Sequence, residues 1–134
     1  MLSGKREINT MDMIYSKKYF EDDSVFLKEI TELFITNLSD LNDGLVIGFK
    51  TNDPGPFFRN YYKSKTTLEL IGNENLMAKA DLICDMLKTK SIASIDMFLL
   101  NSFRNVCNQE IESLTARVKY YENYISFREN RAIL

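Results

Sequence analysis

The sequence predicts an all-α fold, because helix breakers are few and the apolar residues follow a helical period. Only two prolines and five glycines interrupt the 134 residues. After residue 10 the apolar residues recur at spacings of three and four, and the alternation typical of a half-buried strand is nearly absent. This length predicts one domain, 1–134, in which we expect residues 1–9 to be flexible and residues 122–134 to form a C-terminal extension.

The first long helix is predicted to begin near Asp23 and to end before residues 52–55. Asp22, Asp23 and Ser24 offer an N-cap and acidic groups that the helix dipole favours, and the sequence Asn-Asp-Pro-Gly at 52–55 interrupts the pattern. About 28 residues lie between them, roughly 42 Å of α-helix. The apolar stripe that we expect to face the core comprises Phe26, Ile30, Leu33, Leu38, Leu41, Leu45 and Phe49, with Phe34 at its shoulder.

Three further helices follow from breaks and caps. Pro56 begins a helix that runs to Ile71, and the Gly-Asn pair that follows predicts its end. A third helix continues to residues 88–90, and Ser91 or Ser94 is the candidate N-cap of the fourth. The apolar positions are Leu76, Ala80, Ile83 and Leu87 in the third helix, and the heptad Leu100, Cys107, Leu114 and Tyr121 in the fourth. Four helices joined by short loops predict an antiparallel up-down four-helix bundle.

Additional segments flank this predicted bundle. Residues 10–20 have the pattern of a short extra N-terminal helix laid over one end. The fourth helix, from Ser91 to Arg128, spans roughly 55 Å, so its surplus turns are expected to project. The aromatic and apolar residues of this end are Tyr120, Tyr121, Tyr124, Ile125, Phe127 and the triplet at 132–134. Two explanations remain open: these residues mediate a homodimer, or they cover residues 10–20 of the same chain.

The most informative count is that of histidine, which is zero. Without an imidazole, the chain has no His-centred triad, no His-ligated zinc and no histidine phosphorelay of its own. The two cysteines, Cys84 and Cys107, are too few for a disulfide framework and too far apart for a C-x-x-C motif. We therefore expect buried thiols in a reducing compartment, and no metal site or cofactor.

Charge and hydropathy restrict the partners and the compartment. The N-terminal residues lack the apolar core of a signal peptide, and no stretch approaches the roughly 18 apolar residues of a transmembrane helix. The net charge is −2, which argues against a nucleic-acid binder, because phosphate contacts need a cationic surface. We expect a cytoplasmic protein that binds neither nucleic acid nor membrane.

Residues 57–76 carry the most telling motif. They read Phe-Phe-Arg-Asn-Tyr-Tyr-Lys-Ser-Lys-Thr-Thr-Leu-Glu-Leu-Ile-Gly-Asn-Glu-Asn-Leu. This segment resembles the signature helix of histidine-containing phosphotransfer (HPt) domains, H-x-L-K-G-[SA]-x-x-x-[LI]-G-x-x-x-L, which a helix of type L-x-x-x-A-x-x-[LI]-x-x-x-[LM] follows. Ile71 and Gly72 align with the family's aliphatic-glycine pair, and Leu76 aligns with the next leucine, without gaps. The resemblance covers residues 10–121 and implies a bundle of HPt type.

The departures from the family motif carry the functional content. Tyr62 stands at the position of the phosphoacceptor histidine, Lys65 on the family's lysine, and Thr66 on its glycine. Histidine carries a phosphoryl group as a labile phosphoramidate, whereas a tyrosine phenol, with a pKa of about 10, would form a stable ester. Thr66 also fills the notch that glycine leaves for the approach of a partner. The resemblance therefore implies a pseudo-phosphotransfer protein and not an enzyme.

The same segment keeps features that suit docking. Arg59, Lys63 and Lys65 place three positive charges and no acid between Pro56 and Leu68. Receiver domains of two-component systems present an acidic phosphoacceptor pocket, so the resemblance implies binding to a response-regulator or hybrid-kinase receiver domain without phosphate relay. The candidate partner-binding residues are Phe58, Arg59, Tyr62, Lys63, Lys65, Thr66 and Glu69. The rival interpretation is a homo-oligomeric helical scaffold that uses the C-terminal helix and has no phosphorelay role.

Simpler structural roles also remain open for these residues. A rotation of the helix about its axis would bury Tyr62 and expose Tyr61, and the three cations have the pattern of a solvated face. Asp81 and Asp85 are one turn apart like an acid/base pair, but nothing in the sequence orients or desolvates them, so we expect a solvated face. The methionines and Cys107 are expected to fill the core.

Overall fold

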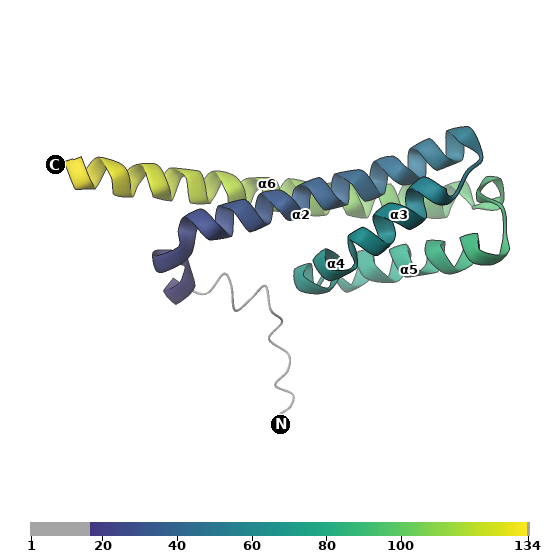
Figure 1. Ribbon diagram of the computed structural model, residues 1–134, viewed down its shortest axis with the longest axis horizontal. Helices are drawn as coiled ribbons and strands as arrows, with labels where there is room; N and C mark the ends of the chain where they lie inside the picture. The colour runs from purple at the N-terminus through teal and green to yellow at the C-terminus, as the bar shows by residue number, and fades with distance from the viewer. Residues whose placement is uncertain (1–16, 134) are drawn as a thin grey trace, which may run out of the picture.

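The computed structural model of the chain describes residues 17–133, and within this range the predicted all-α class is confirmed. Two long helices, α2 (Lys17–Thr51) and α6 (Met97–Ile133), lie side by side (Figure 1). The helices α3 (Gly55–Lys63), α4 (Lys65–Ile71) and α5 (Glu74–Thr89) and the 3-10 helix η2 (Ile92–Ser94) lie between them in the chain. Of the extra helix predicted over 10–20, residues 10–16 lie outside the described range, and 17–20 belong to α2.

The chain direction reverses after α2, after α4 and after α5 (Figure 1). The helices α3 and α4 run back along α2, α5 returns beside them, and α6 runs back along the full assembly. The predicted surplus of the last helix over the first is confirmed: the regular part of α2 after the non-helical Asp23 covers residues 24–51, whereas α6 has 37 residues. Both long helices also extend beyond α3, α4 and α5 (Figure 1).

This two-helix extension begins where the short helices stop. On α2, the Asn37 side chain donates a hydrogen bond to Thr67 of α4. On α6, the Glu110 carboxylate accepts a hydrogen bond from Asn73, the N-cap of α5. We call residues 23–36 of α2 and 111–130 of α6 the arm. On its α6 side Tyr121 is buried, whereas Tyr120 and Phe127 are exposed.

Most helix ends fall where local residues predict them. The helix α2 has one non-helical residue, Asp23, at the predicted start of its regular part. It ends at Thr51, where Asn52 adopts a positive φ of 54° and the Asp53 carboxylate accepts from the Gly55 N–H at 2.9 Å. Gly72 likewise adopts a φ of 73°, which ends α4 as predicted.

The single helix predicted over 56–71 is wrong, because Ser64 divides it into α3 and α4. Ser64 has φ −94° and ψ 1° and is fully buried. Its hydroxyl donates to the Asn37 carbonyl of α2 at 3.2 Å. A buried hydroxyl needs an acceptor, and this bond is made at the cost of a regular helix at that residue.

The predicted start of the fourth helix at Ser91 or Ser94 is also wrong. The Asp96 carboxylate accepts from the Phe98 N–H at 2.8 Å, so α6 begins after Asp96. Ser94 instead donates to the Ser91 carbonyl within η2. The reason is burial: Ile92 and Ile95 are fixed in the core, so the chain between them forms a short 3-10 turn before the helix starts.

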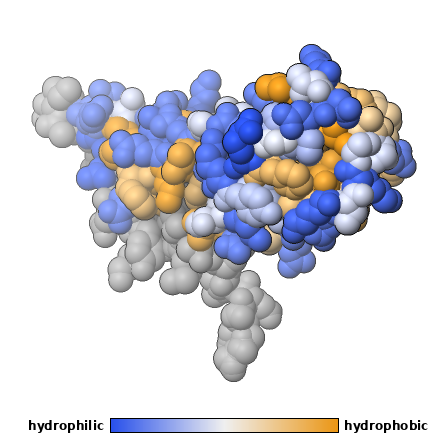
Figure 2. Space-filling view, turned by 45° about the vertical axis from the view of Figure 1, so that its right-hand side comes forward, coloured by the Kyte–Doolittle hydropathy of each residue, from blue (hydrophilic) through white to orange (hydrophobic). Residues whose placement is uncertain are grey.

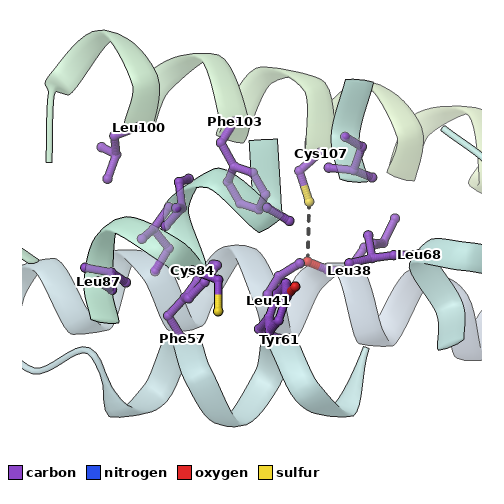
Figure 3. Packing of buried hydrophobic residues seen from close by; sticks show 14 of the residues in the cluster. Leu38, Leu41, Phe57, Tyr61, Leu68, Cys84, Leu87, Leu100, Phe103 and Cys107 are labelled. Atoms are coloured by element: carbon purple, nitrogen blue, oxygen red, sulfur yellow. Dashed lines mark hydrogen bonds between the residues drawn. The ribbon is translucent and has the colours of Figure 1, made fainter. Parts of the chain in front are cut away.

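The core confirms the heptad Leu100, Cys107, Leu114 and Tyr121 and the central part of the α2 stripe, but not the whole stripe. Figure 3 shows this core, with the Cys107 thiol directed at the Leu38 carbonyl, 3.5 Å away. Phe26 and Leu33 are each 55% exposed, because α3 and α4 do not reach the arm. Met97 is also exposed rather than a core residue. Both cysteines are buried free thiols, as predicted.

The position of α3 depends on a close approach at Gly44 of α2. A Cβ placed on Gly44 would lie 2.7 Å from the Pro56 carbonyl oxygen and 2.9 Å from the Asn60 amide nitrogen. The oxygen belongs to the backbone of α3 and cannot rotate away. Glycine is therefore required for α3 to pack this closely on α2.

We predict that Gly44→Ala destabilises the protein. Alanine gains about 1 kcal/mol of helix propensity, but the clash with Pro56 displaces α3, and we expect a net loss of about 1–3 kcal/mol in the free energy of unfolding. Urea denaturation followed by circular dichroism measures it. The matched control Thr36→Ala, at an exposed site of the same helix, should change stability by less than about 0.5 kcal/mol. A Gly44→Ala variant as stable as the wild type would contradict the prediction.

Candidate functional site

The seven residues predicted to bind a partner all lie on α3 and α4, but the structure divides them into two groups. Four of them, Tyr62, Lys65, Thr66 and Glu69, are exposed, and the adjacent Lys65 and Thr66 each lie three or four residues from Tyr62 and from Glu69. We call these four residues the outer face. Arg59 and Lys63 are also exposed but lie towards α2, and Phe58 is half-buried against the core.

Tyr62 is 58% exposed, whereas its neighbour Tyr61 is 6% exposed, so the alternative rotation of this helix is not the one adopted. The two rings meet edge to face with centroids 5.3 Å apart. Burial raises the pKa of the Cys84 thiol of α5, and Lys88 and a side-chain hydrogen bond with Tyr62 partly offset this rise. The ring of Tyr62 is therefore accessible and packs at its side against Tyr61.

Tyr61 connects the outer face to α5 from beneath. Its hydroxyl donates to the Asp81 carboxylate at 2.6 Å, and its ring stacks on Phe57 with centroids 5.9 Å apart (Figure 3 shows Tyr61 beside Phe57). Burial, followed by the hydrogen bond and the negative charge of Asp81, raises the pKa of Tyr61 well above its usual value. The sequence did not identify Tyr61 as part of the site.

The expectation that Asp81 and Asp85 form a solvated face is wrong for Asp81 and right for Asp85. Asp81 is half-buried because the Tyr61 hydroxyl occupies one of its oxygens. Asp85 is exposed and lies 3.8 Å from the Lys88 ammonium. Exposed pairs of this kind contribute little to stability.

The three cations of this segment have different surroundings. The Lys63 ammonium pairs with the Asp40 carboxylate of α2 at 2.7 Å. Arg59 lines a groove of about 360 Å³ between α2 and α3, together with Asp40 and Asp43. The Lys65 ammonium lies over the Tyr61 ring, 5.5 Å from its centroid, and takes part in none of the ion pairs of the described residues. Arg59 is exposed and likewise takes part in none of these ion pairs, so Lys65 and Arg59 both offer positive charge to solvent, whereas the charge of Lys63 is paired.

Asn37 of α2 holds the junction of α3 and α4 and was missed by the sequence analysis. Its side-chain amide donates to the Thr67 hydroxyl at 2.8 Å, while its carbonyl accepts from Ser64. A polar residue one turn before Leu41 in an otherwise apolar stripe was the available signal. Thr67 is buried by this contact, and Thr66 beside it remains exposed.

The chemistry available in the described part of the chain is limited. Residues 17–133 contain no group of three or more carboxylate or thiol side chains placed to hold a metal ion. Burial raises the pKa of the Cys107 thiol to about 12, so this thiol is protonated at neutral pH. No helix in the same range is long and apolar enough to cross a bilayer.

We predict that Tyr61→Phe lowers the free energy of unfolding by about 1–2 kcal/mol, because Asp81 loses its donor. The sign of the pH dependence follows from the raised pKa of Tyr61 in the folded state. Above about pH 10 the unfolded phenol ionises while the folded one stays neutral, so the wild type loses stability as pH rises. The Tyr61→Phe variant should lose less over this range.

Thermal unfolding at several pH values between neutral and alkaline measures both effects. Tyr62→Phe serves as the control, because Tyr62 is 58% exposed, and it should unfold nearly as the wild type does. Equal losses in the two variants would show that the bond to Asp81 contributes nothing particular.

Comparisons with models of protein families, with curated proteins and with solved structures gave no match to this chain. The function proposed below is therefore supported by the geometry of the outer face and by the resemblance of residues 57–76.

Proposed function

We propose that the chain is an HPt-like signalling module that lacks the phosphoacceptor histidine and binds a receiver domain without relaying phosphate. The observation that carries this proposal is the exposed ring of Tyr62 at the position where the family motif has its histidine. Lys65, one turn away, is the family's lysine in the same alignment. The successive reversals of α2, α3–α4, α5 and α6 agree with the up-down four-helix arrangement that the resemblance implies.

Tyr62 has the properties of an interface anchor. An exposed aromatic ring that already packs against a neighbouring ring loses less conformational freedom on binding, and such rings are common among the residues that dominate binding energy. The edge-to-face contact with Tyr61 restricts Tyr62 in this way. Tyr62 would fill the space above the receiver's acidic pocket.

Lys65 supplies the electrostatic part of docking. Because its ammonium has no carboxylate partner in the described structure, its charge remains available to an acidic surface. Charges at an interface rim mainly raise the rate of association and select the partner. Lys63, which pairs with Asp40 of α2, contributes less to this field than its sequence position suggested, whereas the exposed Arg59 adds to it.

Relay of phosphate is not supported by the groups around Tyr62. A phenol with an ordinary pKa near 10 is protonated at neutral pH and needs a base to act as a nucleophile. Its neighbour Cys84 has a raised pKa, so it is a protonated thiol and a poor base. The exposed side chain of Thr66, on the same face, hinders approach to the distance of phosphoryl transfer. In this proposal the chain acts in the cytoplasm, where receiver domains work.

We predict that Lys65→Glu and Tyr62→Ala each weaken binding to the cognate receiver by about tenfold or more, because they remove the charge and the anchor of the outer face. Titration calorimetry against a panel of receiver domains from the same organism measures it. Lys119→Glu on α6 is the matched charge-reversal control and should leave the affinity unchanged. Absence of binding by the wild type to every receiver would contradict the proposal.

A second experiment separates binding from relay. A receiver carrying a radiolabelled phosphoryl group is mixed with this chain or with a phosphotransfer domain that has its histidine. We expect label to reach the histidine domain and not this chain. Label on the wild type that is lost in Tyr62→Phe would show that Tyr62 is an acceptor, and the proposal of a silent module would be wrong.

A further inference from the structure

The face of α2 that carries α3 and α4 continues into the arm beyond the end of these helices. The helix α3 begins against Gly44, and α4 crosses Asn37, where the bond to Thr67 forms. The helix α4 then ends at Ile71. Neither short helix therefore runs along Phe26, Ile30 and Leu33 of α2, although these residues continue the same helix face.

This part of the face is apolar and regular. Phe26, Ile30 and Leu33 follow one another at spacings of four and three, and Asn37 follows after four more. Such spacing is that of a packing seam between two helices. Phe26 and Leu33 are each 55% exposed and Ile30 is partly buried. We call these three residues the arm seam. Figure 2 shows apolar side chains gathered among hydrophilic ones on the arm, at the left of the view.

We propose that a second copy of this chain covers the arm seam, with the two α2 helices antiparallel. Two-fold symmetry brings the same surface of both copies together, so the seam must complement itself. A two-fold axis near Ile30 meets this condition, because it places Phe26 of each copy against Leu33 of the other. The large and the medium side chain then alternate across the contact, as close packing requires.

The proposed contact extends an interface that the chain already forms. The helices α3 and α4 run antiparallel to α2, and the α2 helix of a second copy would run in the same direction as they do (Figure 1). It would continue the line of α4 along the same face, with its N-terminal end towards the C-terminal end of α4. This head-to-tail order is the one that helix dipoles favour.

The size of the seam predicts a weak dimer. Residues 23–36 span about 20 Å of helix, which offers less than the roughly 800 Å² per partner of a typical tight interface. We therefore expect association in the micromolar range, with dimers at high concentration and monomers at low concentration. This inference does not depend on receiver binding, which concerns the outer face.

Sedimentation velocity over about 5 to 500 μM tests the proposal on the full chain. The wild-type mass should rise from 15.6 kDa towards twice that value. The double variant Phe26→Glu with Leu33→Glu should weaken the dimer by at least about tenfold, since it places charges in the seam. Ile47→Glu is the matched control: Ile47 is 50% exposed on the same helix but outside the arm, and its variant should dimerise like the wild type.

Oxidative cross-linking gives a second measurement that does not depend on how the glutamate variants fold. Ile30→Cys should form a disulfide-linked dimer, because the two-fold axis brings both copies of residue 30 together, whereas Ile47→Cys should not. The native thiols of Cys84 and Cys107 are buried and should give little background. A wild type that stays at 15.6 kDa throughout would overturn the proposal. A second result would also overturn it: the wild type is monomeric, and the glutamate variants of the seam weaken receiver binding. In that case a receiver, and not a second copy, would occupy this face.

Discussion

The close packing of α3 on α2 at Gly44 is the constraint on which the functional surface depends. The Pro56 carbonyl occupies the space that a side chain at Gly44 would need, so α3 packs on α2 with the side of Pro56 and Asn60 turned towards it, which sets its rotation about its axis. That rotation turns Phe57 and Tyr61 into the core and leaves Tyr62 outside. The exposure of Tyr62 is thus a consequence of helix packing and not of its residue type, since the adjacent tyrosine is buried.

A buried residue organises the surface above it. The ring of Tyr61 supports the Lys65 ammonium and meets the edge of Tyr62, while its hydroxyl reaches Asp81 on α5. Because all of these contacts start from one side chain, the charge and the aromatic ring of the outer face keep fixed relative positions. A rigid arrangement of this kind lowers the entropic cost of binding a partner.

Local signals in the sequence were sufficient for some elements and not for others. The breaks at 52–55 and at Gly72 were predictable, because the residues there adopt positive φ or exclude helix by themselves. The division at Ser64 was not predictable, because it depends on a carbonyl of another helix, that of Asn37. The same holds for Leu33. The apolar periodicity placed it on the correct face of α2, but it is exposed because α4 ends before it reaches this residue. For the candidate site, the helical segment that carries the residues was predictable, whereas the pairing of Lys63 with Asp40 of α2 was not.

The two proposed surfaces lie at different positions along the molecule, and this has a consequence for how they combine. The outer face is the side of α3 and α4 turned away from α2, whereas the arm seam lies on α2 itself, past the end of α4. A second copy bound at the seam would therefore leave Tyr62 and Lys65 accessible in both chains. Two docking faces held in one dimer raise the effective concentration of the second face once the first is bound. Such a dimer would hold two receivers, or a dimeric receiver protein, more tightly than one face alone, without any change in the contacts that each face makes.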